Sequence, residues 1–200
     1  MNETTVKKRS RTGQATRERI FREALHLFAK KGFEATSIKD IAGAVGVADA
    51  ALYRHFSSKD DIASAIFSFH YANLARSIAV LASQSENFAV ALRQLVTLLC
   101  DLFDDTPDVF AFILLNQHDH LRFVGDEDNV VTALVGIMQR AIDSGELGID
   151  NAILAASIAL GAAIQPAVFC LYGRLPGPLG QHRDTIEAAI ARAMNLHGAP

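Results

Sequence analysis

The stretch from Thr36 to Lys59 constrains the fold of this chain more than any other part of the sequence. Apolar residues recur there at helical spacing, at Ile38, Ile41, Ala42 and Val45. Ser37 can cap this helix, because its hydroxyl can accept from the backbone N–H of Asp40. Gly46 then permits a tight turn, and a second helix is expected from about Ala48 or Asp49 to Phe56. This arrangement predicts a helix-turn-helix, which places one helix in the major groove of DNA.

The outward face of the second helix suits a DNA groove. Leu52 and Phe56 are expected to point into the core, which leaves small residues, a phenol and a guanidinium exposed. Small side chains allow close approach, and arginine can pair bidentately with guanine. We predict phosphate contacts for Thr36, Tyr53 and Lys59 and base contacts for Ala50, Ala51 and Arg54. The full set of predicted DNA-binding residues is Thr36, Ser37, Lys39, Asp49, Ala50, Ala51, Tyr53, Arg54, His55 and Lys59.

A glycine between two amphipathic helices also occurs in ordinary three-helix domains, so it is a weak signal alone. The run Leu-Tyr-Arg-His-Phe at 52–56, followed by Lys59, is more specific. With it, residues 16–67 resemble the TetR family of one-component transcriptional regulators. The resemblance rests on Arg17, Ile20, Ala24, Leu27, Phe28, Gly32, Phe33, Thr36, Ser37, Ile38, Ile41, Ala42, Gly46, Val47, Leu52, Tyr53, His55, Phe56, Lys59 and Ile62.

The resemblance implies a fold, a function and partners. The fold is all-α with about nine helices: an N-terminal three-helix DNA-binding domain joined to a C-terminal helical domain for ligand binding and dimerisation. The function is that of a ligand-responsive regulator, with repression as the expected mode. A homodimer formed through the last two helices would bind a near-palindromic operator in double-stranded DNA. A small-molecule effector would occupy the C-terminal domain.

Two residues depart from the family pattern at the start of the second helix. The family usually carries Ser or Thr where this chain has Ala48, which has no side chain to cap a helix. Family members often carry a residue that tolerates or attracts phosphate at the position of Asp49. The carboxylate of Asp49 should therefore repel the DNA backbone, unless it accepts a hydrogen bond from a cytosine amino group. These departures leave the base contacts open.

The net charge of −3 hides an asymmetry between the two parts of the chain. Residues 1–60 carry a net charge of +5, and residues 61–200 carry −8. A basic N-terminal part on an acidic body is typical of a DNA-binding protein with a second, different domain. We expect a disordered basic arm at 1–15, a DNA-binding domain at 16–60 and a helical domain at 61–200. The arm can equally be a solvated tail without a specific role.

The body reads as helical almost throughout. Expected helices cover 16–31, 59–84, 88–104 after the cap Asn87, a segment from Pro107, 127–144 after Asp126, a segment from Asp150 to about Gly173, and 183–196. Cys100 and Cys170 are too few and too isolated for a metal site or a disulfide framework, and are expected to be buried free thiols in a reducing cytoplasm.

A ligand pocket in the body has moderate support from the sequence. Aromatic residues are abundant there, and polar groups lie among them, as a mostly apolar pocket with a few fixing groups requires. The predicted ligand-binding residues are Phe67, His70, Asn73, Phe103, Phe110, Leu114, Gln117, His118, Phe123, Gln165 and Phe169. The alternative is ordinary core packing. We expect an apolar or aromatic ligand with one polar end, and no cofactor.

Two other functions are compatible with parts of the sequence. Residues 151–173 carry no charge and could span a bilayer by length alone, but Asn151, Gln165 and Pro166 interrupt the run, so a buried helix is favoured. A metal-dependent enzyme could use His118, Asp119 and His120. Adjacent positions do not share one helix face, however, so neither a metal site nor an enzyme is expected.

Overall fold

The computed structural model describes residues 3–120, 124–125 and 129–195, with side chains described from residue 14 onward except at 115–119. These residues form α-helices and short helical turns without a strand, which confirms the all-α prediction. The elements are α1 (Glu3–Lys31), α2 (Ile38–Val45), α3 (Asp49–Tyr53), α4 (Lys59–Gln84), α5 (Phe88–Asp105), α6 (Pro107–His120), α7 (Val130–Asp143), α8 (Ala152–Leu171), the 3-10 helix η3 (Leu179–His182) and α9 (Arg183–Ala193).

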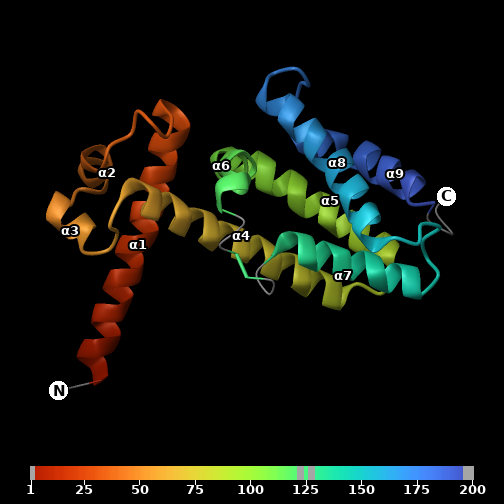
Figure 1. Ribbon diagram of the computed structural model, residues 1–200, viewed down its shortest axis with the longest axis horizontal. Coiled ribbons are helices and arrows are strands. Elements are labelled where there is room, and N and C mark those ends of the chain that lie inside the picture. The colour runs from red at the N-terminus through yellow and green to blue at the C-terminus, as the bar shows by residue number, and fades with distance from the viewer. Residues whose placement is uncertain (1–2, 121–123, 126–128, 196–200) are drawn as a thin grey trace.

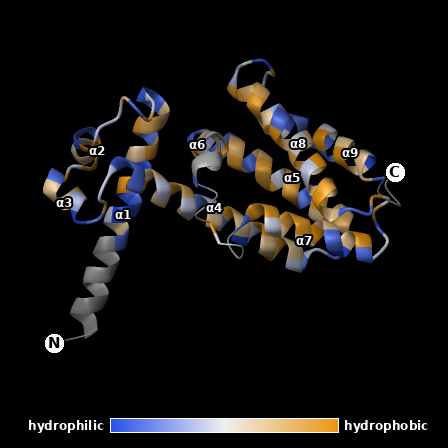
Figure 2. Ribbon diagram, in the orientation of Figure 1, coloured by the Kyte–Doolittle hydropathy of each residue, from blue (hydrophilic) through white to orange (hydrophobic). Residues whose placement is uncertain are grey.

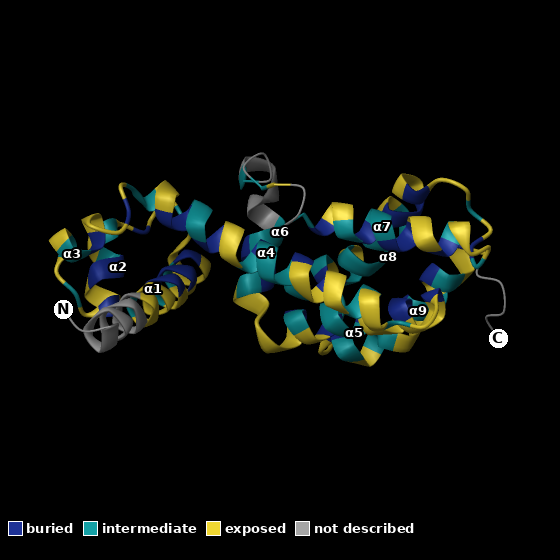
Figure 3. Cartoon of the chain, turned by 90° about the horizontal axis from the view of Figure 1, so that it is seen from below, coloured by how far each residue is buried: buried dark blue, intermediate teal, exposed yellow. Residues whose placement is uncertain are grey.

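The helices form a small head and a larger body (Figure 1). The head contains α1, α2 and α3. The long helix α4 starts in the head and runs into the body, where α5, α6 and α7 pack against it. Helices α8 and α9 pack on α7 and α5 and against each other. Figure 3 shows the same division from below, with α4 as the connection between the two parts.

Helix α2 begins with a complete capping box. The Ser37 hydroxyl accepts from the Asp40 N–H at 3.2 Å, and the Asp40 carboxylate accepts from the Ser37 N–H at 2.9 Å. Hydrogen bonds from the Ser37 side chain and backbone, together with Lys31 3.0 Å away, hold the pKa of Asp40 well below its usual range. The carboxylate therefore stays charged in mildly acid solution, where the first turn of a helix favours it. Gly46 ends α2 with a φ of 73°, as the predicted turn requires.

Helix α3 is shorter than predicted. It ends at Tyr53 rather than at Phe56, because the N–H groups of His55 and Phe56 both bond to the carbonyl of Leu52 and the chain then turns toward α4. Ala48 occupies the N-cap position and makes no side-chain hydrogen bond there, as its methyl group dictates. Asp49 follows as the first helical residue.

Helix α1 is longer than predicted. The sequence predicted a disordered arm at 1–15, whereas the described backbone is helical from Glu3 onward. Residues 3–15 contain no proline, and the four basic residues Lys7, Lys8, Arg9 and Arg11 favour helices. Gly13 is the weakest helix former in this segment, and a single glycine costs only about 1 kcal/mol.

Asparagine residues cap three helices of the body. The side-chain oxygens of Asn87, Asn129 and Asn151 accept from backbone N–H groups at the starts of α5, α7 and α8. The cap at Asn87 was predicted. The predicted cap Asp150 is replaced by Asn151, because this amide lies one position before the first helical residue of α8. Asn129 caps α7, and the predicted cap Asp126 lies outside the described residues. Helix α9 also ends earlier than expected, at Ala193.

Candidate functional site

Helix α3 presents its predicted outward face to solvent. Leu52 and Phe56 are 1% and 4% exposed and anchor the helix in the head, whereas Tyr53 is 57% exposed. Arg54 and His55 follow it on the surface. Ala50 is exposed, and Asp49 and Ala51 are partly exposed. From α2 and its cap, Lys39 and Ser37 add a second exposed polar edge.

Thr36 does not lie on this surface. Its side chain is in the interior, with the residue 2% exposed, and its hydroxyl donates to the Gly32 carbonyl at 2.8 Å, with the Leu27 carbonyl at 3.4 Å. The predicted phosphate contact is therefore corrected to a structural role. Thr36 closes the end of α1, where helix carbonyls otherwise lack partners.

Lys59 is also held by the protein. Its ammonium donates to the Phe33 carbonyl at 2.7 Å and lies 4.2 Å from the centre of the Phe33 ring. The Glu34 carbonyl lies 3.4 Å away, and the Lys59 side chain is 19% exposed. The predicted phosphate contact is corrected here too, because the donors of this ammonium point at the loop between α1 and α2. Lys59 ties the first turn of α4 to the head.

The role of Thr36 gives a prediction that separates stability from DNA contact. Thr36→Val keeps the side-chain shape but removes the hydroxyl, so the free energy of unfolding should fall by about 1 kcal/mol. The salt dependence of DNA binding should stay unchanged, since no phosphate contact is lost. Thermal unfolding and binding titrations at several salt concentrations measure both. A shallower salt slope in Thr36→Val would contradict the structural role.

A chain of aromatic rings connects the head to the body through α6. Phe33 packs against Phe28 at 5.1 Å between ring centres, and Phe28 stacks on Phe112 of α6 at 5.9 Å and 13°. Phe28 and Phe112 are buried. Helix α6 therefore contacts the head directly, in addition to the continuous path along α4.

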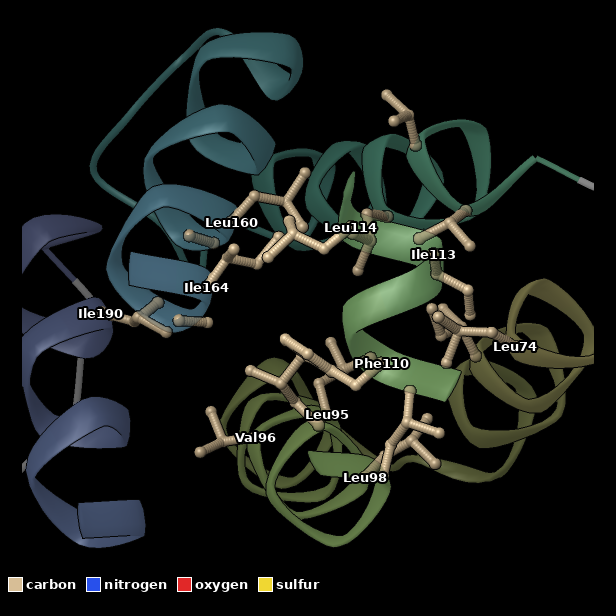
Figure 4. Close-up of a pocket in the computed structure, with 18 of the residues that line it drawn as sticks. Leu74, Leu95, Val96, Leu98, Phe110, Ile113, Leu114, Leu160, Ile164 and Ile190 are labelled. Atoms are coloured by element: carbon tan, nitrogen blue, oxygen red, sulfur yellow. The ribbon is translucent and has the colours of Figure 1, made fainter. Parts of the chain in front are cut away.

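The body contains a partly open apolar cavity of about 160 Å³ between α4, α5, α6, α7, α8 and α9. Its walls are almost entirely aliphatic, and Figure 4 shows side chains from several helices converging on the space. The lining residues are Tyr71, Leu74, Ile78, Leu92, Leu95, Val96, Leu98, Leu99, Leu102, Phe110, Ile113, Leu114, Val130, Val131, Leu134, Met138, Ala159, Leu160, Ala163, Ile164 and Ile190.

The predicted ligand-binding residues whose side chains are described divide into three groups. Phe110 and Leu114 line the cavity. Phe67 and Phe103 are buried beside lining residues, since Phe67 stacks on Tyr71 at 5.1 Å and Phe103 packs edge-on against Phe110 at 5.2 Å. The remaining described positions, His70, Asn73, Gln165 and Phe169, do not line it.

The residues that do not line the cavity lie on the surface or are partly buried elsewhere. Gln165 and Phe169 lie exposed on the outer side of α8, and Asn73 accepts from Arg76 at 2.6 Å. His70 is partly buried against Phe69, and this burial lowers its pKa. The side chains of Gln117, His118 and Phe123 lie outside the described residues. The aliphatic walls were missed because leucine and valine at helical spacing look the same around a cavity as in a filled core.

His120 packs into the body rather than facing a metal site. Its Nδ1 lies 3.2 Å from the Ser64 hydroxyl oxygen of α4, and its ring lies 5.2 Å from that of Phe67. Within the part of the chain whose side chains are described, no three metal-binding side chains come together. The side chains of His118 and Asp119 are not among them. Cys100 is buried and Cys170 partly buried, and both are free thiols.

Helix α8 is largely apolar, as its colouring in Figure 2 shows, and one of its faces is exposed. Ile153, Leu154 and Phe169 are 70%, 49% and 48% exposed. Gly161 lies between them on the same side, where a Cβ would meet nothing within 4 Å. Among the described residues, α8 alone is long and apolar enough to cross a membrane by length and composition. It packs against α7 and α9 in the body, so its outer face is the part left uncovered.

The comparisons with known proteins identify the head. Residues 20–66, which cover the C-terminal part of α1, all of α2 and α3 and the start of α4, match the family model described as bacterial regulatory proteins, tetR family. This chain belongs to the TetR family. The match includes the exposed face of α3 and the buried residues that hold it.

Two curated relatives and two solved structures show how far this TetR-family similarity extends. The repressor NicS of Pseudomonas putida is 26% identical over 69% of this chain and 66% of its own length. The regulator AcrR of Shigella flexneri is 38% identical over 34% of this chain and 32% of its own length. The matched part of this chain thus spans less than two thirds of these relatives.

The solved structures match the whole fold. The fatty acid degradation regulator FadR of Bacillus halodurans has a TM-score of 0.74 at 16% identity, covering 92% of this chain and 99% of that one. FadR of Bacillus subtilis, solved in complex with stearoyl-CoA, has a TM-score of 0.73 at 17% identity with the same coverage. At such identities these likenesses establish the fold of this TetR-family chain and nothing about its ligand.

Proposed function

We propose that this TetR-family chain is a ligand-responsive repressor of transcription that binds double-stranded DNA as a homodimer. The exposed face of α3 carries the proposal, because two buried anchors hold a short helix with its small, aromatic and basic residues toward solvent. Arg54 and Ala50 would contact base edges, and Tyr53 and Lys39 would contact phosphates. Its place of action would be the cytoplasm, where the DNA is.

Dimerisation would use α8 and α9. The exposed apolar stripe on α8 is unusual for a helix in contact with water, and α9 beside it exposes Thr185, Ala189 and Arg192. Two copies related by a two-fold axis would bury both stripes against each other. Such a dimer also presents two α3 helices, which must lie about 34–36 Å apart to enter successive major grooves. Covering α8 in this way removes the reason to place it in a membrane.

The cavity would receive the effector and communicate with the head by two routes. Tyr71, Leu74 and Ile78 of α4 line it, and α4 continues into the head at Lys59. Phe110, Ile113 and Leu114 of α6 also line it, while Phe112 on the same helix stacks on Phe28 of α1. A ligand that fits one position of α4 and α6 better than another would shift the separation of the two heads.

A metal-dependent enzyme centred on His118, Asp119 and His120 receives no support from His120. That ring is engaged with Ser64 and Phe67 between α4 and α6. The side chains of the other two residues lie outside the described ones.

A gel-shift assay with fragments of the genome flanking the gene tests the proposal. The full chain should retain one or a few fragments in the presence of excess nonspecific DNA, and the affinity should fall steeply as salt increases. Size-exclusion chromatography coupled to light scattering should give a dimer. Equal retention of all fragments, or no retention at low salt, would contradict sequence-selective DNA binding.

A further inference from the structure

We propose that the cavity selects an uncharged, hydrocarbon-rich molecule of about one ring, and that the Tyr71 hydroxyl is the residue that distinguishes a polar substituent on it. This inference rests on the proposed function, because it names the effector class of the same cavity. Three observations support the inference: the composition of the cavity walls, the position of the Tyr71 phenol and the size of the cavity.

The walls offer nothing to neutralise a charge. Among the described lining residues, Tyr71 alone carries a side-chain oxygen or nitrogen. The other side chains are hydrocarbon, apart from the thioether sulfur of Met138. A carboxylate or an ammonium moved from water into such surroundings without a partner costs several kcal/mol. Apolar groups gain about 25 cal/mol for each Å² removed from water. The cavity therefore favours neutral ligands strongly over ionised ones of the same shape.

The hydroxyl of Tyr71 is held in a fixed place. Its ring stacks on Phe67 at 5.1 Å and 16°, and its hydroxyl donates to the Asn129 side-chain oxygen at 3.4 Å. The same oxygen of Asn129 accepts from the Val131 N–H at 2.9 Å, at the start of α7. Burial raises the pKa of the phenol, so Tyr71 is neutral at physiological pH.

This geometry leaves the phenol able to serve a ligand. Its bond to Asn129 is long for an O–H donor, so exchanging it for a bond to a ligand oxygen loses little. The phenol oxygen can also accept from a ligand hydroxyl. One hydroxyl or carbonyl on the ligand would then point toward the junction of α4 and α7, with the hydrocarbon part against the leucines of α5 and α6.

The size of the cavity indicates what its apolar interior can hold, although the cavity is partly open to solvent. A closed space of roughly 150 Å³ lined by Leu, Ile and Phe holds a benzene-sized molecule. At about 160 Å³, this cavity matches a single ring with a short alkyl group. Suitable probes are 4-isopropylphenol, isopropylbenzene and 4-isopropylbenzoate, because they share one hydrocarbon frame and differ only in the substituent opposite the alkyl group.

Calorimetric titration of the full-length dimer with these three probes, in the absence of DNA, tests the inference. We expect 4-isopropylphenol to bind most tightly, isopropylbenzene more weakly, and 4-isopropylbenzoate at least about 100-fold more weakly than the phenol. Tyr71→Phe should weaken phenol binding about fivefold, the loss of one hydrogen bond, and leave isopropylbenzene unchanged. Tyr172→Phe removes an exposed phenol and is the matched control, with no effect on any probe.

Several outcomes would overturn the inference. Binding of the benzoate as tight as that of the phenol would show that an ionised group is accommodated. Equal loss of phenol and isopropylbenzene binding in Tyr71→Phe would give Tyr71 a purely structural role. Absence of binding by both uncharged probes would reject the ligand class. The gel shift measures DNA binding separately. None of these outcomes would therefore contradict the DNA-binding part of the proposed function.

Discussion

Arg54→Glu should abolish sequence-selective DNA binding while the protein stays folded and dimeric. The side chain lies exposed just after the last residue of α3, so its replacement disturbs no packing. A bidentate arginine–guanine pair contributes about 1–3 kcal/mol of discrimination, and the reversed charge adds repulsion from nearby phosphates. Together these predict a loss of affinity of about 100-fold or more, measurable by fluorescence anisotropy with the fragment retained in the gel shift.

Arg174→Glu is the matched control for this change. Arg174 is exposed in the loop after α8, in the body and away from the head, and the substitution alters the net charge by the same amount. It should leave the affinity within about twofold, because long-range effects are screened beyond roughly 10 Å at ordinary salt. Similar losses in both variants would show that net charge, rather than a contact by Arg54, governs binding.

Gly161→Arg should convert the dimer into a monomer without destabilising the fold of the single chain. A Cβ at this position meets nothing within 4 Å, so a side chain there projects outward from α8. A non-glycine residue also favours the helix by about 0.5–1 kcal/mol. At a two-fold interface, however, each substitution brings two bulky cations together between the apolar faces. Sedimentation at micromolar concentration should show a monomer, and DNA affinity should fall with it.

Gln139→Arg on the exposed side of α7 is the control for the same added charge. Its long side chain can keep the contact that Gln139 makes with Asp143. This variant should remain a dimer and bind DNA as the unmodified chain does. A dimeric Gly161→Arg would place the interface on another surface and leave the apolar stripe of α8 without a function.

The sequence predicted the head well because its signals are local. Two features of α2 depend only on residues within one helical turn: the cap formed by Ser37 and Asp40, and the turn at Gly46. The spacing of these residues in the sequence therefore predicts both features. Lys59 was misjudged for the opposite reason, because the Phe33 carbonyl that it binds lies 26 residues earlier and only the folded chain brings the two together. Thr36 was misjudged although the Gly32 carbonyl lies only four residues away, because spacing alone does not show that this side chain is buried.

The cavity was harder to predict. Polar residues such as Asn73 and Gln165 looked suitable as ligand-fixing groups, but helix rotation places them outward. Tyr71 was overlooked, although among the described lining residues it alone carries a hydroxyl group. Whether a helical side chain faces a void or a neighbour depends on how six helices meet, and periodicity along one helix does not contain that information.

The stack of Phe28 on Phe112 limits how freely the two parts of this protein can be recombined. Engineered sensors often join the DNA-binding part of one regulator to the ligand-binding part of another. Here a transplanted head would need a flat aromatic ring at position 28 to cover Phe112, as well as a carbonyl placed to receive Lys59. A chimera without these two contacts would have a folded head and a folded body, but ligand binding in the body would not change DNA binding by the head.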